Sequence, residues 1–331
     1  MNFKVLYVDT ISEPQAQINV EGISSAYNKI VKLIKFDYRK IAKYFGKQIM
    51  NTSLYIVAKI TRPNLIHIGK GETIQGDTIK IIKKNSKCKV IHFYGDFRNT
   101  PQPYVIDIGK YADITLLYHK DQRIIKQHHD LGVKNIGFWW VGSDPDIYRP
   151  IQLEKKYDVV FFGNNADFLP GHEERRNLIK AIAESGITIH IFGNNWDLFT
   201  DHQNIVLHNF VVSKEFVDTC SKAKITLGYN AVNDVYYYAS WRRPFNCMAC
   251  GAFHLTKYFP GIEEVFETKK HLVWFDTINE AVELIHFYLN NSEERENIAQ
   301  NGREEIINNH TWDKRIEEMI NIYKSIGGEI K

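Results

Sequence analysis

The stretch YDVVFFGNN, residues 157–165, decides the fold, because it has the pattern of a buried strand that runs directly into a Gly-Asn loop. The pattern that follows, residues 174–186, predicts a helix with Gly186 as its carboxyl-terminal cap. A second strand is predicted in ITIHIFGNN, residues 187–195, which ends in the same four letters. This order of strand, helix and strand predicts a parallel sheet covered by helices, since parallel neighbours need a crossover connection.

The same alternation continues on both sides of this stretch. Towards the amino terminus, apolar runs predict strands at 4–9, 54–59, 64–69, 88–96, 114–119 and 135–140, and helices at 24–45 and 124–131. Towards the carboxyl terminus, they predict strands at 224–230, 253–256 and 272–275, and helices at 217–222, 280–289 and 293–310. Between the two series lies GSDPDIYRPIQLEKK, residues 142–156, which is rich in Pro and Asp and ends in a charged run. The chain is therefore predicted to be α/β, with two doubly wound halves that divide at residues 148 and 149.

Composition places few limits on function. The 331 residues are 44% hydrophobic and 24% charged, which is ordinary for a globular protein. A net charge of +3 is too small to predict a nucleic-acid partner and suits an anionic small substrate equally well. No stretch approaches the ~20 apolar residues of a membrane helix, and the first residues do not resemble a signal peptide. Four scattered cysteines predict no disulfide framework, so a cytoplasmic location is expected.

Three predicted strand ends in the second half share one character. They are GNN at 163–165, GNN at 193–195 and GYN at 228–230. Glycine lets a ligand approach the backbone closely, and asparagine tolerates tight turns and forms hydrogen bonds. Each Gly-Asn pair alone is a common turn former, but the carboxyl ends of parallel strands meet at one edge, where such sheets bind ligands. The candidate residues are Gly163, Asn164, Asn194 and Asn230.

The stretch SWRRPFNCMACGAF, residues 240–253, supplies the positive charge. Pro244 suits the first turn of a helix, which places Arg242 and Arg243 at the helix start. Free N–H groups and two guanidinium groups there favour a phosphate or diphosphate site over a solvated surface pair. The Cys-x-x-Cys in the same stretch lacks a second pair of ligands with zinc spacing, so we expect a core-facing helix and no metal.

The first half has fewer candidates. Asp96 follows a predicted strand, where its carboxylate could orient or deprotonate a hydroxyl acceptor. Asp9 ends the first predicted strand and allows the same interpretation. For each residue, a loop-capping role is at least as good an explanation. The chain has no Gly-x-Gly-x-x-Gly after its first strand, no P-loop and no Gly-x-Ser-x-Gly, which argues against dehydrogenase, kinase and α/β-hydrolase functions.

Several motifs in the second half resemble one glycosyltransferase family. They are DVVFFGN, RRPFNCMACGAF, Pro260-Gly261, Glu294-Arg295, Asn301-Gly302-Arg303 and His310-Thr311. Together they look like the glycosyltransferases of the spore-maturation CgeB type, which belong with the broad group 1 glycosyltransferases. The likeness is specific in the second half and looser in the first. It implies the GT-B fold, in which two Rossmann-like doubly wound domains face each other across a cleft.

The resemblance also implies that the two domains bind different substrates. Residues 149–311 would bind a nucleoside-diphosphate sugar, and residues 1–148 would bind a hydroxyl acceptor, with a helix at 312–331 packed back on the first domain. No metal or other cofactor is obligatory in this fold, and the reaction would be retaining. The acceptor class stays open among a glycan, a protein, a small molecule and a modified nucleic acid.

The resemblance further implies roles for particular residues. Arg242 or Arg243 would contact the diphosphate, with Gly163 and Asn164 beside it. Residues 207–211 would run alongside the base of the donor nucleotide, which adds His208 and Phe210 to the donor-binding candidates. The catalytic candidates are Asp96 and Arg243, and the remaining donor-binding candidates are Asn194, Asn230 and Asn246.

Two positions depart from the family pattern. Asn246 stands where relatives carry a glutamate that binds the donor ribose, and Tyr238 stands where the wider group has an earlier glutamate. An amide can bind a diol, though without charge assistance. Alternatives to an active glycosyltransferase therefore stay open. They are a catalytically degenerate nucleotide-sugar-binding or structural protein, a sugar epimerase and a DNA-base glucosyltransferase.

Overall fold

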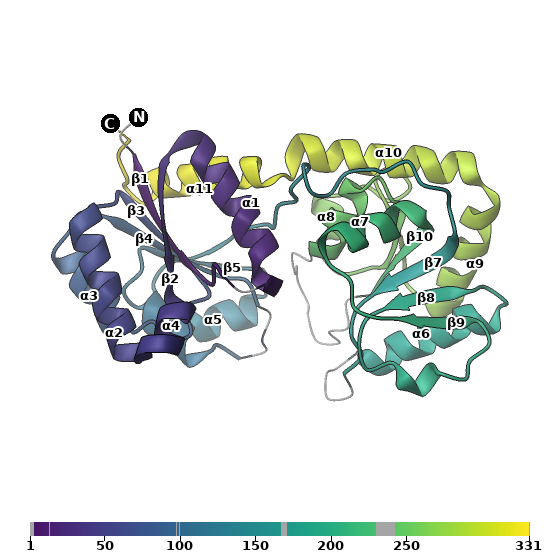
Figure 1. Ribbon diagram of the computed structural model, residues 1–331, viewed down its shortest axis with the longest axis horizontal. Helices are drawn as coiled ribbons and strands as arrows, with labels where there is room; N and C mark the ends of the chain where they lie inside the picture. Colours follow the sequence, from purple (N-terminus) through teal and green to yellow (C-terminus); the bar gives the residue numbers. More distant parts are fainter. Residues whose placement is uncertain are drawn as a thin grey trace. The chain divides into compact units, whose positions relative to one another are not determined.

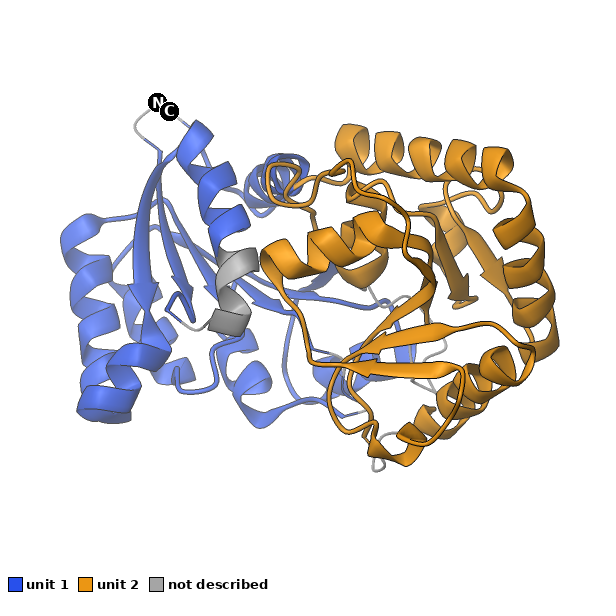
Figure 2. Ribbon diagram, turned by 45° about the vertical axis from the view of Figure 1, so that its right-hand side comes forward, with its two compact units in different colours: residues 1–141, 312–331 blue, residues 142–311 orange. Residues whose placement is uncertain are grey.

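The computed structural model describes residues 3–12, 14–96, 98, 100–166, 171–229 and 242–330, without the side chains of 14–20. The chain forms two compact units, which Figure 2 colours separately. Unit 1 comprises residues 1–141 and 312–331, and unit 2 comprises residues 142–311. The division falls before Gly142, at the start of the Pro- and Asp-rich segment, slightly earlier than the sequence predicts.

Unit 1 contains a six-stranded parallel sheet in the order β2-β1-β3-β4-β5-β6. Its strands are β1 (Lys4–Asp9), β2 (Lys32–Asp37), β3 (Leu65–Gly69), β4 (Lys89–Tyr94), β5 (Ile114–Leu117) and β6 (Ile136–Phe138). Its helices are α1 (Pro14–Ile30), α2 (Tyr38–Thr61), α3 (Gly76–Lys84), α4 (Pro103–Gly109), α5 (Gln122–Asp130) and α11 (Trp312–Ser325). Because every strand pair is parallel, all the carboxyl ends meet at one edge of this sheet.

Two predictions in unit 1 are wrong. The helix predicted at 24–45 is interrupted by strand β2, which pairs along its whole length with β1. Ile30, Ile34 and Ile41 imitate helical spacing there, but pairing with β1 decides the structure. The strand predicted at 54–59 lies inside α2, where Met50, Leu54 and Ala58 recur every four residues and are buried. A short apolar run does not distinguish the two structures by itself.

Unit 2 contains a second six-stranded parallel sheet, in the order β12-β11-β10-β7-β8-β9. Its strands are β7 (Tyr157–Phe162), β8 (Ile189–Phe192), β9 (Ile205–His208), β10 (Ala223–Gly228), β11 (His254–Lys257) and β12 (Val273–Phe275). Its helices are α6 (His172–Glu184), α7 (Ser213–Lys222), α8 (Arg242–Ala249), α9 (Ile278–Asn290) and α10 (Ser292–Asn309). The two doubly wound α/β sheets predicted from the sequence are confirmed.

The order of strands in unit 2 fixes where a ligand site can form. The chain runs from β7 outward to β8 and β9, then returns to β10 on the other side of β7. This reversal beside β7 is the switch point at which doubly wound sheets bind ligands. Phe162 of β7 pairs with Phe192 of β8, so the two loops that follow these strands start side by side.

The carboxyl-terminal segment returns to unit 1, where α11 lies beside α1 (Figure 1). The indole of Trp312 fills the space over Gly22, where a Cβ would overlap it. Trp139 Nε1 donates to Arg315 O at 3.2 Å, and Arg315 Nε donates to Val141 O at 2.8 Å. These contacts attach α11 to the end of the unit 1 sheet. Among the helices of the described residues, none is long and apolar enough to cross a membrane.

Candidate functional site

The two FGNN loops of unit 2 are joined into one structure. Gly163 N donates to Phe192 O at 3.0 Å, and Asn194 N donates to the side-chain oxygen of Asn164 at 2.8 Å. A Cβ at Gly193 would overlap the carbonyl of Gly163, so only glycine allows the loops to approach this closely. The Asn164 side chain therefore holds the loops together, while the backbone at Gly163 forms the surface of the edge.

Arg243 reaches this edge from the start of α8. Its guanidinium carbon lies 5.6 Å from the centre of the Phe161 ring. A Cβ at Gly163 would stand 3.4 Å from Arg243 Nη2, so the guanidinium lies over the Gly163 backbone. Arg242, the preceding residue, is exposed. Of the two predicted arginines, Arg243 is the one whose position at the edge the structure establishes.

A third arginine, which the sequence analysis did not select, lies at the same place. Arg175 of α6 is only 4% exposed, and its guanidinium carbon lies 5.4 Å from the ring centres of both Phe161 and Trp196. Its Nη2 donates to Asn164 O at 2.6 Å, while Nε is buried without a hydrogen-bond partner. Burial and the nearby Arg243 lower the pKa of Arg175 to about 9, so the group stays charged at pH 7.

The arginine pair has an electrostatic consequence. Within the described residues no carboxylate forms an ion pair with Arg175, although burial of an unpaired charge is costly. An anion that binds between or beside the two guanidinium groups would lower the cost of burying their charge. Arg175 lies in the first turn of its helix, where a positive charge opposes the helix dipole. An arginine at such an unfavourable position is a feature of the sequence that could indicate an anion site.

His208 and Phe210 lie at the end of β9 and just beyond it. The His208 ring stacks on Phe192 with 4.2 Å between ring centres and an interplanar angle of 5°. Its Nε2 is 2.9 Å from His190 Nδ1, and burial lowers the pKa of His208 below its usual value. Gly193 N donates to His208 O at 3.2 Å, which attaches the strand end to the FGNN loops. Phe210 is 45% exposed.

Asn246 lies on α8 and is already engaged through its side-chain oxygen. Ser143 Oγ donates to Asn246 Oδ1 at 3.0 Å, and Ser143 N donates to His310 O at 2.9 Å. The amide thus connects α8 to the start of unit 2 and to the end of α10. Its Nδ2 donates to no protein group among the described residues. Asn230 and Tyr238 lie outside the described residues.

The cysteines of the Cys-x-x-Cys face the core, as the sequence predicts. Cys247 is fully buried and Cys250 nearly so, and both lie near Cys220. Burial raises the pKa of the Cys220 thiol, whereas the contacts of Cys247 with Cys220 and His254 outweigh its burial and lower its pKa to about 5. No group of three metal-ligating side chains was found in the part of the chain that the structure describes.

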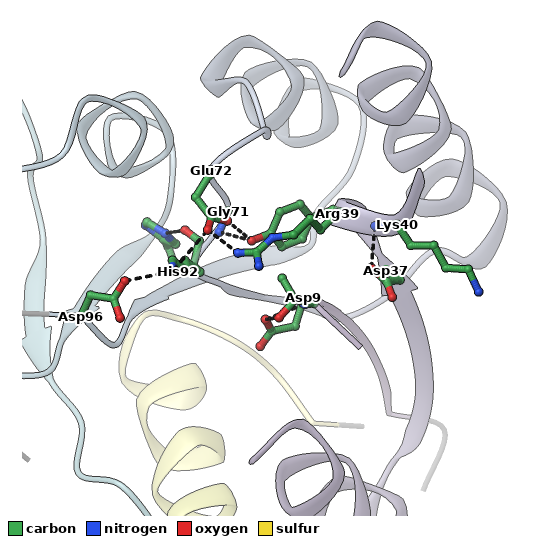
Figure 3. Close-up of polar contacts among 11 residues, drawn as sticks. Asp9, Asp37, Arg39, Lys40, Gly71, Glu72, His92 and Asp96 are labelled. Carbon is green, nitrogen blue, oxygen red and sulfur yellow. Dashed lines mark hydrogen bonds and ion pairs between the residues drawn. The ribbon is translucent and has the colours of Figure 1, made fainter. Parts of the chain in front are cut away.

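Unit 1 gathers four carboxylates where its strands end (Figure 3). They belong to Asp9, Asp37, Glu72 and Asp96. Asp96, the predicted catalytic residue, has a 42% exposed side chain, and its Oδ2 is 3.0 Å from Lys70 Nζ. Lys70 Nζ is also 3.3 Å from Glu72, which Tyr38 and Arg39 contact as well. Asp96 is therefore the outer member of an ion-pair network.

Sequence and structure comparisons place this geometry among known proteins. Residues 174–321 match the family model described as glycosyl transferase-like. The match begins just before Arg175 and includes Arg243 and Asn246. No curated protein sequence matches the chain.

Solved structures identify the fold. Anabaena HepE in complex with UDP-glucose is 11% identical with a TM-score of 0.67, over 98% of this chain and 100% of that one. Sucrose-phosphate synthase from Thermosynechococcus elongatus is 11% identical with a TM-score of 0.69, over 98% and 99%. A glycosyltransferase from Rickettsia africae is 12% identical with a TM-score of 0.66, over 98% of each chain. The fold is GT-B, with two Rossmann-like units.

The GT-B fold brings most of the predicted donor-binding residues to one edge of unit 2. These residues are Gly163, Asn164, Asn194, His208 and Arg243. Arg242 is exposed beside them, and Asn246 lies one helical turn further along α8. Arg175 is the residue that the structure adds to this set. The narrower resemblance to the CgeB type remains a prediction.

Proposed function

We propose that the protein is a glycosyltransferase that moves a sugar from a nucleoside diphosphate to a hydroxyl acceptor. The single observation that carries the proposal is the convergence of Arg175 and Arg243 on Phe161 at the end of β7. The glycosyl transferase-like match over residues 174–321 and the GT-B fold support the same conclusion.

In this proposal, the donor diphosphate lies over the backbone of Gly163. Two guanidinium groups and the amino-terminal end of α8 then stabilise the negative charge that develops on the leaving diphosphate. Because these groups are fixed before the donor binds, they perform the task that a divalent cation performs in other transferases. Metal independence is accordingly part of the proposal.

The base and the ribose would lie beside the diphosphate. His208 and Phe210 offer aromatic surface for a base, and the Nδ2 of Asn246 can donate to a ribose hydroxyl. The HepE structure was solved with UDP-glucose, so uridine nucleotides are the first to be tested. By the family resemblance, we propose that unit 1 binds the acceptor and that the anomeric configuration is retained.

Titration calorimetry with UDP, GDP, ADP and TDP tests the donor site. We expect one of the four to bind wild-type protein, and the Arg242→Ala/Arg243→Ala double variant to bind it at least about tenfold more weakly, as for lost charge-assisted hydrogen bonds. If folded wild-type protein bound none of the four nucleotides, the proposal would be wrong. The proton coupling constant at the anomeric carbon of the product would decide between retention and inversion.

A second candidate function is nucleotide-sugar binding without turnover. The observation that favours it is Asn246 itself, because its oxygen accepts from Ser143 and no carboxylate occupies this position. A long incubation of the protein with its tightest-binding nucleotide sugar separates the two candidates. Release of free nucleoside diphosphate above the rate without protein supports the enzyme, and a bound but intact donor supports the binding protein.

A further inference from the structure

We propose that Asp9, and not Asp96, is the carboxylate of unit 1 that accepts a hydrogen bond from the acceptor hydroxyl. This inference rests on the proposed glycosyltransferase function. It concerns the edge shown in Figure 3, where β1, β2, β3 and β4 end. The four carboxylates at this edge differ in what already satisfies them, and that difference identifies Asp9.

Three of the four carboxylates have partners that account for their positions. Asp37 has no cation partner in the described part of the chain, but both of its oxygens hold backbone in place: Oδ1 caps the amino terminus of α2 by accepting from Lys40 N at 2.9 Å, and Oδ2 accepts from Ser12 N at 2.8 Å and from Ser12 Oγ. Glu72 binds Arg39 and Lys70, and Asp96 binds Lys70. A carboxylate held by a neighbouring cation is a weak acceptor for a further hydroxyl, because its charge is already compensated.

Asp9 has no cation partner among the described residues. Its Oδ2 accepts from Tyr7 OH at 2.6 Å, and its Oδ1 accepts from Thr10 N at 2.7 Å, with Thr10 Oγ1 at 3.5 Å. A carboxylate offers about four acceptor positions, so these three bonds leave about one for a ligand. Asp9 is partly buried and retains some exposure, so a ligand can reach it.

The position of Asp9 is also fixed before any ligand binds. Tyr7 is fully buried, and its ring lies 5.1 Å from that of His67 on the neighbouring strand. On the other side, the Asp9 carboxylate packs against Gly69 at the end of β3, where a Cβ would overlap it. A rigid acceptor with one open position suits the orientation of a single hydroxyl group.

Burial gives a second reason to assign Asp9 a function. Burial, opposed by the hydrogen bonds from Tyr7 and Thr10, raises the pKa of Asp9 above its ordinary value. An ionised carboxylate in this place therefore costs stability, and proteins retain such costs chiefly at functional sites. The Asp96 side chain, by contrast, is 42% exposed and paired with Lys70.

The test compares three variants in the full-length protein. Asp9→Asn and Asp96→Asn remove the two candidate carboxylates, and Asp113→Asn is a matched control at the opposite edge of the same sheet, where Asp113 pairs with Lys83. The readouts are donor affinity by calorimetry and the rate of UDP release from UDP-glucose with water as acceptor. If wild-type protein binds another nucleotide of the panel more tightly, its glucose conjugate replaces UDP-glucose.

We expect Asp9→Asn to keep wild-type donor affinity and to release nucleotide at least about tenfold more slowly, as for a lost hydrogen bond to a charged group. Asp96→Asn should lose less than Asp9→Asn, and Asp113→Asn should match wild type. An undiminished rate in Asp9→Asn, or a larger loss in Asp96→Asn, would overturn the assignment. Absence of donor binding in wild type would instead contradict the proposed function.

Tyr7→Phe provides a second test that leaves the carboxylate in place. Loss of the hydroxyl removes a hydrogen bond that lowers the pKa of Asp9. The acid limb of the rate profile should therefore move to higher pH in Tyr7→Phe, while donor affinity stays unchanged. An acid limb at the wild-type position would show that Asp9 does not govern the rate. Thermal unfolding of each variant confirms that the comparison is made on folded protein.

Discussion

Arg175 is buried against two aromatic rings, and the charged neighbour that lowers its pKa most is another arginine, Arg243. If it binds the donor diphosphate, Arg175→Gln should weaken nucleotide binding by about 1.5–3 kcal/mol, the range for hydrogen bonds to charged groups. Arg176→Gln is the matched control, because Arg176 is adjacent and its Nη1 donates to Asn165 Oδ1 at 3.1 Å. Calorimetry measures both, and equal losses would refute a special role for Arg175.

The titration of Asp9 should change how the free energy of unfolding depends on pH. Its folded-state pKa is raised above the unfolded value, so between those two pKa values the folded state holds the proton that the unfolded state has lost. The contribution of Asp9 to the free energy of unfolding is therefore full at low pH and is lost as pH rises through the folded-state pKa.

Asp9→Asn lacks this titration. Relative to wild type, the variant should gain stability as pH rises from the ordinary aspartate pKa of about 3.9 through the raised folded-state pKa. Urea unfolding at several pH values measures the difference. Parallel stability curves for the two proteins would show that the pKa of Asp9 is not raised by folding.

Asn246 offers a direct test of the departure from the family pattern. In Asn246→Glu, a carboxylate oxygen can still accept from Ser143 Oγ, and the second oxygen becomes a charged acceptor for a ribose diol. We expect tighter nucleotide binding, by a factor of a few up to about tenfold, the gain from neutral to charge-assisted bonding. Asn246→Ala, which removes both hydrogen-bonding groups, should change affinity in the opposite direction.

At the scale of elements, the joined FGNN loops explain why unit 2 can hold a fixed anion site. Gly193→Ala should cost about 1–3 kcal/mol in unfolding free energy, the usual range for overpacking, because the new methyl group meets the backbone of Gly163. Urea unfolding measures the loss, and an unchanged free energy of unfolding in Gly193→Ala would show that the loop contact is not tight.

The elements also show what a single sequence can and cannot reveal. Strands β7 and β8 were predictable because their apolar runs end in recognisable turn residues. Strand β2 was not, since its identity depends on pairing with β1 rather than on its own pattern. The same division applies to the site. Arg243 precedes a proline that indicates a helix start. Arg175 was not selected as a site residue, because its place beside Phe161 depends on how the chain folds.

At the scale of the whole molecule, the chain crosses from unit 1 to unit 2 and back again. Unit 2, residues 142–311, has its own core, built from Val159, Phe161, Ile189, Ile225 and Leu255 among others. It also contains every described residue to which we assign donor binding. A fragment of residues 142–311 should therefore fold alone and bind the same nucleotide as the full chain, within about tenfold, or 1.4 kcal/mol.

Unit 1 differs because part of it comes from the end of the chain. Residues 1–141 alone would expose the surface that α11 covers and would lose the buried Trp312, Ile316, Met319 and Tyr323. Losing four large buried apolar side chains, at about 1.5–3 kcal/mol each, exceeds the stability of many domains. Residues 1–141 should therefore show no cooperative thermal transition by circular dichroism.

The matched control joins residues 312–331 to residue 141 through a short Gly-Ser linker, which the contact between Val141 O and Arg315 Nε makes feasible. We expect that fusion to melt cooperatively, and cooperative melting of residues 1–141 without it would show that α11 is dispensable for unit 1.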